Sequence, residues 1–548
     1  MKKKLPLSVA ALLFLMAAAY AKAEDVRFDI SRFQIDGNTL LSAQEIDRAV
    51  ANLNGPNKSF ADIQKAIDAL NAAYRKAGYS AVTAHAPEQA LTSGVVHLLI
   101  IQSTIANVTV SGNHHFDSAN IRSSVRGLRS GESPDLHALS EAIQLANENP
   151  AKQVEVTLGR GDKINEIDAH INVRDQSPLH AFLTAENTGV PASGKWRTGA
   201  ALQYGNLFNL DHVVTVAYSS SPDSPDGVHV ALWSIGYRIP IYRLGDSADL
   251  IYASSSVNTP GTSPTLGGLL GIVGKGDILG ARWNHYMARR GDSTSKVVFS
   301  IDRKYSNSRC TVGGIDVSFA PPTPPISSCV PYTTMPAGVN YSARYRQQGS
   351  VLDFNLGLAR NIALGTAYTN VSGRTDRYSY LTLGNRDTRD DFMLLRAGVT
   401  FVRLFAGDWQ ARVAANAQFA RDPLPASEQF SLAGYSAVRG FDERAVAADS
   451  GAILNAEIYT PGLAANSGLP GKLRALAFYD LAAGANRNTG GSATPARVRL
   501  ASAGVGVRYS AGKHVDLRAD VARVGASGPA TTASRGDWKG HFGAVLDF

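Results

Sequence analysis

The chain changes its pattern of hydrophobic and polar positions once, near residue 175. Before that point, segments with helical periodicity alternate with short strand-like segments. After it, helical periodicity is lost, and segments of about ten residues alternate between apolar and polar side chains. The clearest helical segment ends near Gly78 and places its apolar side chains on one face of an α-helix: Phe60, Ile63, Ile67, Leu70 and Tyr74.

The same order of elements occurs twice in residues 26–175. Each repeat is expected to run strand, helix, helix, strand, strand. The first strand of each repeat ends in a similar turn, Asp36-Gly37-Asn38 or Ser111-Gly112-Asn113. This duplication predicts two small α/β domains, residues 24–102 and 103–175. The expected elements are Phe28–Gly37, Ala43–Leu53, Phe60–Gly78, Tyr79–Ala84 and Val95–Gln102, then Ile105–Val110, Asp117–Val125, Pro134–Asn147, Val154–Leu158 and Ile167–Val173.

Each small domain is expected to expose a strand edge. The unpaired N–H and C=O groups of such an edge can bind an extended peptide by β-augmentation. The alternative is that the two domains are structural spacers.

Residues 176–548 predict an antiparallel transmembrane β-barrel. In the final segment, Trp538, Phe542, Ala544, Leu546 and Phe548 share one face, and polar side chains occupy the other. In a membrane barrel, one face meets lipid and the other lines a polar lumen. A soluble antiparallel sandwich would also alternate, but the segments here are many and long, and an export signal precedes them.

About sixteen segments carry this alternation, an even number as expected for a bacterial outer-membrane barrel. If the small domains are periplasmic, the first strand runs outward and the periplasmic turns are short, as at Leu404–Asp408 and Ser510–Lys513. The expected strands are Leu179–Glu186, Lys195–Tyr204, His212–Ser219, Val228–Tyr237, Ala248–Ser256, Ile278–Ala288, Lys296–Tyr305, Ser350–Leu358, Ile362–Ser372, Phe392–Leu404, Trp409–Arg421, Ala452–Thr460, Lys472–Leu481, Val498–Tyr509, His514–Val524 and Trp538–Phe548.

The N-terminus carries the export signal. Three lysines, Lys2 to Lys4, precede a short apolar stretch, and Ala21-Lys22-Ala23 has the small residues that signal peptidase requires. Residues 1–23 are therefore predicted to be a signal peptide. The alternative, an N-terminal membrane anchor, would need a longer apolar stretch.

The chain contains two cysteines, Cys310 and Cys329. In an oxidising compartment we expect them to pair as a disulfide that closes a local loop. Two thiolates alone provide too few ligands for a zinc site.

Composition and motifs argue against nucleic-acid binding and catalysis. The formal net charge is +8, but no long basic block accompanies it. The glycine-rich run Gly267–Gly276 resembles a phosphate-binding loop, yet Leu269 stands where the first glycine belongs and Gly276 follows Lys275 in place of Ser or Thr. We therefore expect no enzymatic activity, no cofactor and no metal site.

The connection Leu432–Arg444 contains the most unusual motif, Val438-Arg439-Gly440-Phe441, with one cation among apolar residues and a glycine. An arginine in a loop can simply be solvated. The alternation in Leu473–Leu481, however, places Asp480 on the lumenal face. A guanidinium could bind that carboxylate if the loop folds into the barrel. Glu457 also faces inward and is the alternative acceptor.

Together these features resemble the TpsB transporters of two-partner secretion, a branch of the POTRA-barrel superfamily. The resemblance covers essentially the whole mature chain: two POTRA-like domains, a barrel of about sixteen strands and the motif at 438–441. The strand motif Phe-x-Asp-x-Gly of the family reads Phe478-Tyr479-Asp480-Leu481-Ala482 here. The resemblance therefore gives Asp480 the role of binding the loop, while Ala482 replaces the glycine.

The resemblance implies a pore in the outer membrane of a Gram-negative bacterium, with periplasmic POTRA domains. Such a pore recognises an unfolded exoprotein (TpsA-type) through its POTRA domains and translocates it to the cell surface. The partners would be this cognate exoprotein and membrane lipid, and the transporter would be a monomer. The implied loop-anchoring and gating residues are Val438, Arg439, Gly440, Phe441 and Asp480.

Many members of the family begin with a plug helix, whereas here the first expected strand follows Ala23 almost at once. Closure of the pore is therefore expected to depend more on the loop around Arg439. Two alternatives stay open at this point. An assembly or insertion factor of the same superfamily would be favoured by more POTRA repeats, and a passive porin or receptor would lack POTRA-like units or carry a plug domain.

Overall fold

The computed structural model describes residues 26–256, 275–307, 330–382, 386–464, 470–528 and 533–548, together with the backbone of short strands elsewhere. The predicted signal peptide (1–23), Cys310, Cys329 and residues 267–270 of the glycine-rich run lie outside the described residues. The chain forms two compact units. One comprises Met1–Thr109, Gly127–His137 and Leu158–His170, and the other comprises Val110–Arg126, Ala138–Thr157 and Ile171–Phe548.

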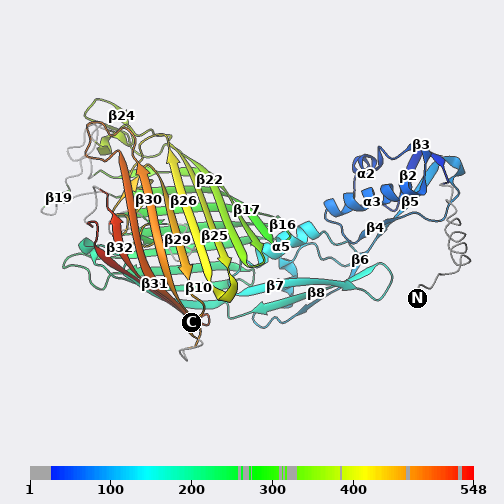
Figure 1. Cartoon of the computed structure of the whole chain (residues 1–548), viewed down its shortest axis with the longest axis horizontal. Coiled ribbons are helices and arrows are strands. Elements are labelled where there is room, and N and C mark those ends of the chain that lie inside the picture. Colours follow the sequence, from blue (N-terminus) through cyan, green and yellow to red (C-terminus); the bar gives the residue numbers. More distant parts are fainter. Residues whose placement is uncertain are drawn as a thin grey trace, which may run out of the picture. The chain divides into compact units, whose positions relative to one another are not determined.

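The first α/β domain combines a three-stranded sheet of order β2-β5-β4 with two helices (Figure 1). The predicted amphipathic helix is confirmed, because Ile63, Leu70 and Tyr74 are buried against the sheet. Asp62 accepts hydrogen bonds from the N–H and hydroxyl of Ser59, which caps the N-terminus of this helix. The elements are β1 (Phe28–Ile30), β2 (Arg32–Asp36), α2 (Ala43–Val50), β3 (Gly55–Lys58), α3 (Phe60–Lys76), β4 (Val82–His85) and β5 (Val95–Gln102).

A second three-stranded sheet follows, with the order β6-β8-β7. Asp175 closes the turn after β6 by accepting hydrogen bonds from the backbone N–H groups of His114, His115 and Phe116. Desolvation raises the pKa of Asp175, but these donors outweigh it and hold the pKa below its ordinary value. The elements are β6 (Thr104–Ser111), α4 (Ser118–Ser124), α5 (Leu136–Ala146), β7 (Lys152–Arg160) and β8 (Glu166–Asp175). Among the described residues, no helix is long and apolar enough to cross a membrane.

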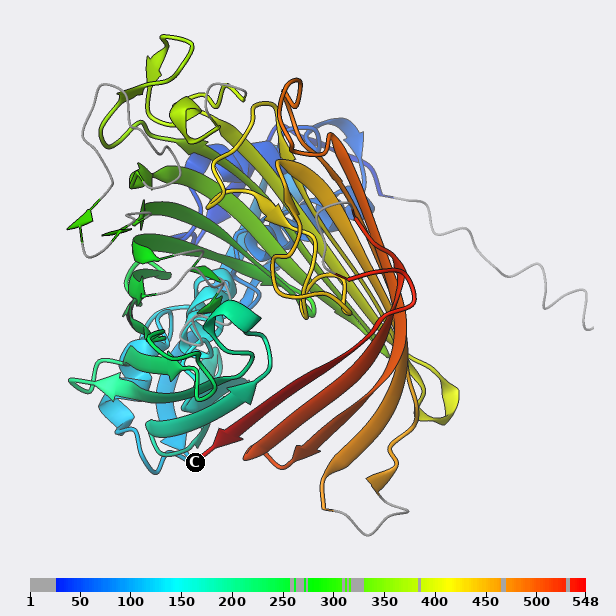
Figure 2. The same ribbon diagram turned by 90° about the vertical axis from the view of Figure 1, so that its left-hand side faces the viewer.

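The rest of the chain forms a closed antiparallel barrel (Figures 1 and 2). Its strand count is sixteen when β20 and β21 are taken as one strand, because both pair with β17 and only Met335 separates them. The predicted alternation is confirmed on β30, where Tyr479 is 50% exposed and Asp480 is 0% exposed. The strands are β9 (Leu179–Glu186), β10 (Arg197–Leu207), β11 (His212–Ser220), β12 (Leu232–Ile241), β13 (Asp246–Ser255), β16 (Gly276–Arg290), β17 (Ser293–Ser306), β20 (Tyr332–Thr334), β21 (Pro336–Gln347), β22 (Ser350–Asn361), β25 (Met393–Leu404), β26 (Gln410–Ala420), β29 (Ser450–Tyr459), β30 (Lys472–Ala485), β31 (Arg497–Ala511), β32 (Val515–Ala526) and β33 (Trp538–Asp547).

The expected set of strands contains two errors that cancel in the count. The strand formed by β20 and β21 was not expected from the sequence, because Pro336 begins β21 and a proline argues against a strand that is paired on both sides. Conversely, Ile362–Ser372 is not a barrel strand. Tyr368 from this segment packs with Tyr380 and others in a small core of the outer loop. Of its large apolar side chains only Tyr368 is buried, whereas Ile362 and Val371 are exposed, and its short strand β23 (Tyr368–Thr369) pairs with β24 (Thr375–Asp376) and not with a barrel strand.

The two ends of the barrel differ in the length of their connections. At the end where β9 begins, short turns join the strands, for example residues 405–409 between β25 and β26. At the opposite end the connections are longer, and residues 421–449 join β26 to β29. This asymmetry is usual for outer-membrane barrels.

The start of β7 is fixed to a short barrel turn by a buried ion pair. The ammonium of Lys152 lies 2.5 Å from a carboxylate oxygen of Asp211, which follows β10, and both side chains are almost completely buried. The hydroxyl of Tyr242 donates to the same oxygen, and Lys152 also donates to Asn120 of α4. Because a charge at this depth is tolerated only when it is paired, the cluster holds α4 and β7 against the barrel.

We predict that Lys152→Ala lowers the free energy of unfolding by about 3–5 kcal/mol, because it leaves the Asp211 carboxylate buried without its cation. Lys152→Met combined with Asp211→Asn should recover most of that loss. Heat- and urea-induced unfolding, followed by the gel mobility of the folded barrel, measures both. Lys163→Ala, which removes an exposed lysine paired with Glu166, is the matched control. Equal stabilities of Lys152→Ala and this control would contradict the assignment.

Candidate functional site

The connection between β26 and β29, residues 421–449, folds back into the barrel (Figure 2). Inside it, β27 (Phe430–Ser431) pairs with β28 (Ala447–Ala448). Its apolar side chains pack against residues of the inner wall, so the segment is held by the barrel over much of its length. This cluster contains Leu432, Ala433, Ala437, Val438, Phe441, Val446 and Ala448 from the loop, and Ile453, Ala482, Val498, Leu500 and Val524 from the strands.

The predicted motif turns the chain inside the loop. Val438 and Phe441 are buried, which places Arg439 and Gly440 against the wall between them. Gly440 has φ +96°, a backbone conformation that favours glycine. Its N–H donates to the Nε2 atom of His541 at 2.9 Å. The imidazole must therefore accept through Nε2, which fixes one neutral tautomer of His541.

Arg439 binds Asp480 through a two-pronged contact. The Nε atom of the guanidinium lies 2.7 Å from one carboxylate oxygen, and Nη2 lies 2.8 Å from the other. The backbone N–H of Arg439 also donates to Asp480, at 3.2 Å. The side chains of both residues are almost completely buried. This bidentate arrangement is the strongest and most directional that a carboxylate offers to arginine.

Glu457, the alternative acceptor, also contacts Arg439. Its carboxylate lies 3.0 Å from Nη1, and Asp520 lies 3.5 Å from the same atom. The guanidinium carbon lies 3.5 Å from the centre of the Phe478 ring, at cation–π distance. Both candidate acceptors therefore meet the same cation, and Asp480 holds it with two hydrogen bonds.

Two further arginines balance the negative charge of this cluster. Arg412 binds Glu457 at 3.0 Å, and Arg508 binds Asp520 at 2.8 Å. With Arg439, the three carboxylates therefore meet three guanidinium groups. A buried polar network is stable only when its charges are paired and its donors and acceptors are satisfied.

Several site residues were not predicted from the sequence. Asn455 donates to Asp480 and to the carbonyl oxygen of Ala437, both at 2.8 Å, and so ties the loop backbone to its anchor. Asn455 is the direct cross-strand partner of Asp480 on β29. His541 is likewise the partner of Asp520 on β33. The available signal was the polar, inward position of each residue in its own strand.

In the family's strand motif, a glycine at the position of Ala482 would let the loop approach β30 closely. In this chain that close approach occurs at another position of β30. Ala482 is buried and packs in the loop's apolar cluster. Two residues further along the same inward face, a Cβ on Gly484 would lie 2.4 Å from Leu432 of the loop. The loop therefore meets the backbone of β30 at Gly484, so Ala482 does not prevent the packing.

The described residues contain no group of three or more His, Cys, Asp or Glu side chains that could hold a metal ion. The clustered carboxylates instead bind arginines. The arrangement joins the loop to the inner wall of the barrel by ion pairs and hydrogen bonds.

Comparison with known proteins shows which family has this architecture. Residues 165–509 match the profile "Haemolysin secretion/activation protein ShlB/FhaC/HecB", and residues 28–103 match "POTRA domain, ShlB-type". The heme/hemopexin transporter protein HuxB of Haemophilus influenzae (strain 86-028NP) is 19% identical over 91% of this chain and 84% of that protein. The outer membrane transporter CdiB of Escherichia coli O6:K15:H31 (strain 536 / UPEC) is 21% identical over 80% of this chain and 70% of that protein.

Solved structures agree on the fold. CdiB from Escherichia coli superposes with a TM-score of 0.73 at 19% identity, covering 96% of this chain and 92% of that one. CdiB from Acinetobacter baumannii gives a TM-score of 0.72 at 15% identity. Since the first profile matches more than half of the sequence, the chain belongs to the ShlB/FhaC/HecB haemolysin secretion/activation family, the TpsB transporters of the outer membrane, and is not an enzyme.

Proposed function

We propose that residues 421–449 form the gate of a pore through which an unfolded exoprotein (TpsA-type) leaves the cell, and that Arg439 anchors this gate. The chain is an outer-membrane protein transporter with periplasmic POTRA domains. The bidentate contact between Arg439 and Asp480 carries the proposal, because it buries a charged side chain of the loop in the wall of the lumen. An exported chain can pass only where this loop gives way.

The anchor is stable and also reversible. Its contacts are ion pairs and hydrogen bonds, which water and the polar groups of a passing chain can replace. Val438 and Phe441 add apolar contacts on either side of Arg439. Such a loop can have a closed and an open position that differ by only a few kcal/mol.

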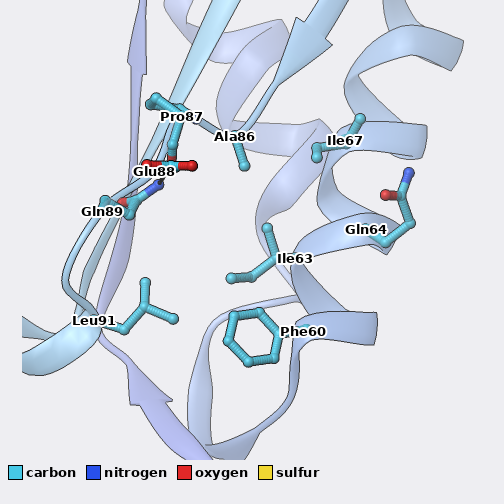
Figure 3. A pocket seen from close by; sticks show the side chains of 9 residues that line it. All are labelled: Phe60, Ile63, Gln64, Ile67, Ala86, Pro87, Glu88, Gln89 and Leu91. Carbon is cyan, nitrogen blue, oxygen red and sulfur yellow. Dashed lines mark hydrogen bonds between the residues drawn. The ribbon is translucent and has the colours of Figure 1, made fainter.

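We propose that the first POTRA domain receives the exoprotein at a groove beside α3. Figure 3 shows Phe60, Ile63 and Ile67 of α3 facing a segment that follows β4. The groove has a volume of about 620 Å³ and is mostly apolar. β4 is also an edge strand of its sheet, so an unfolded chain could pair with its backbone and place an apolar side chain in the groove. The segment opposite α3 comprises Ala86, Pro87, Glu88, Gln89 and Leu91.

We further propose that the transporter acts as a monomer. The ring of strands closes within one chain through the pairing of β33 with β9.

Replacing Arg439 or Asp480 with Ala should lower export of the cognate exoprotein about tenfold or more, because either change leaves a buried partner charge without its main counterion. The barrel should still insert in the outer membrane. Secreted exoprotein and heat-modifiable gel mobility of the barrel measure the two properties. Arg344→Ala, which removes an arginine from a more exposed pair with Asp353, should export normally. Unchanged export in both Arg439→Ala and Asp480→Ala would rule out the anchoring role.

For the groove, Phe60→Ser should weaken binding of the exoprotein, since this ring is 60% exposed at the groove and contributes apolar surface. Export should fall about threefold to tenfold, while pore conductance stays unchanged. Ile164→Ser, at a position 82% exposed and outside the groove, serves as the control. Equal export by the two variants would argue against docking at this groove.

A further inference from the structure

A second buried charge lies in the same loop, eleven positions before Arg439. The side chain of Glu428 is 0% exposed. Its two carboxylate oxygens lie 2.9 and 3.1 Å from the ammonium of Lys304, and the hydroxyl of Thr334 donates to it at 2.8 Å. Arg396 lies 3.5 Å away.

These partners belong to a different part of the barrel wall from those of Arg439. Lys304 is on β17 and Thr334 is on β20, whereas Asp480 is on β30 and Asp520 is on β32. The strand order leads from β17 through β20/β21, β22, β25, β26, β29, β30 and β31 to β32, which is eight steps in a ring of sixteen strands. β17 and β32 are therefore opposite each other around the barrel. Arg396, the third partner of Glu428, is on β25 between these parts of the wall. The chain from Glu428 to Arg439 therefore joins the part of the wall formed by β17 to β25 to the part formed by β29 to β32.

The backbone beside Glu428 is held by side chains of β26 and β20. Gln418 of β26 donates to the carbonyl oxygen of Glu428 at 2.9 Å. The N–H of Ser427 donates to the hydroxyl of Tyr332 at 3.3 Å. Lys304 lies near the outer end of β17, which ends at Ser306. Glu428 is therefore held near the outer mouth of the barrel.

We propose that Glu428 and Lys304 form a second anchor of the loop and keep the pore closed by holding it to β17, six strands around the barrel from the Asp480 strand β30. The inference rests on the proposed gating role of the loop and extends it to residues with no assigned function. A loop fixed on one side only can lean toward that wall and leave an open path. A loop fixed on both sides obstructs the lumen across its width.

The second anchor is weaker than the first, and it is the one that releases first. Lys304 contributes a single compact ammonium, whereas Arg439 has a planar fork on Asp480, two further carboxylates and an aromatic ring. Ammonium contacts are less directional and exchange more readily with water than bidentate guanidinium contacts. Release of Glu428 would therefore open a path while Arg439 still holds the loop.

The root of the loop does not depend on this anchor. Asp449, which is completely buried, binds Arg386 and accepts hydrogen bonds from the backbone N–H groups of Leu424 and Arg487. Neutralising Glu428 should therefore free its segment from β17 without unfolding the loop.

The experiment is a double-mutant cycle read by single-channel recording of the full-length transporter in planar lipid bilayers. Glu428→Gln and Lys304→Met should each raise the open probability about tenfold or more, and the double variant should raise it no further than either single variant. Lys304→Arg keeps the cation and should stay close to wild type. Arg360→Met, which removes an exposed arginine paired with Asp391, is the control for a general loss of charge. The gel mobility of the folded barrel is compared for all variants.

Unchanged open probability in both single variants, or effects that add in the double variant, would overturn the second anchor. So would a Lys304→Arg variant as open as Lys304→Met, because that outcome indicates a steric and not an electrostatic role. Export by Arg439→Ala is measured separately. Normal export by that variant together with a non-additive cycle would reject the gating proposal and keep the Glu428–Lys304 contact. Lost export by Arg439→Ala together with additive effects in the cycle would keep the gating proposal and reject the second anchor.

Discussion

The burial of the Arg439 guanidinium is the constraint on which the rest of the site depends. A cation removed from water must be paired, and here Asp480 binds it with two hydrogen bonds while Glu457 and Asp520 lie at its remaining side. Those carboxylates in turn require Arg412 and Arg508. The buried charge of a single loop residue is thus compensated by charged side chains on several neighbouring strands.

The barrel makes this network possible because cross-strand register brings distant residues together. Asn455 and Asp480 are direct partners on β29 and β30, and Asp520 and His541 are direct partners on β32 and β33. A shift of one residue in either register would turn half of these groups toward lipid. The architecture therefore supports the site only as a closed and correctly registered sheet. The backbone of the loop also binds these strands, because the N–H groups of Arg439 and Gly440 donate to Asp480 and His541.

The sequence predicted those parts of the structure that follow from local periodicity. Helix α3 and the barrel strands repeat their apolar positions with a period that is visible within about ten residues. That period was enough to predict the two α/β domains, the barrel and the inward side chain of Asp480. Residues 336–347 escaped because Pro336 stands at the start of the segment, where proline argues against a paired strand. Residues 362–372 misled because an outer connection can also carry scattered apolar residues: Tyr368 packs in a loop core, while Ile362 and Val371 are exposed. Asn455, His541 and Glu428 could not be assigned because their partners are set by strand register and by the path of the loop, which no local pattern records.

The central claim is that the loop stays inside the lumen because Arg439 is bound there, and amide hydrogen exchange tests it most directly. The N–H groups of Arg439 and Gly440 donate to Asp480 and His541. They should exchange slowly in the resting wild-type transporter and rapidly in Asp480→Ala, with the amides of β30 remaining protected in both. Rapid exchange at Arg439 and Gly440 in the resting wild-type protein, or equally slow exchange in the variant, would contradict the account.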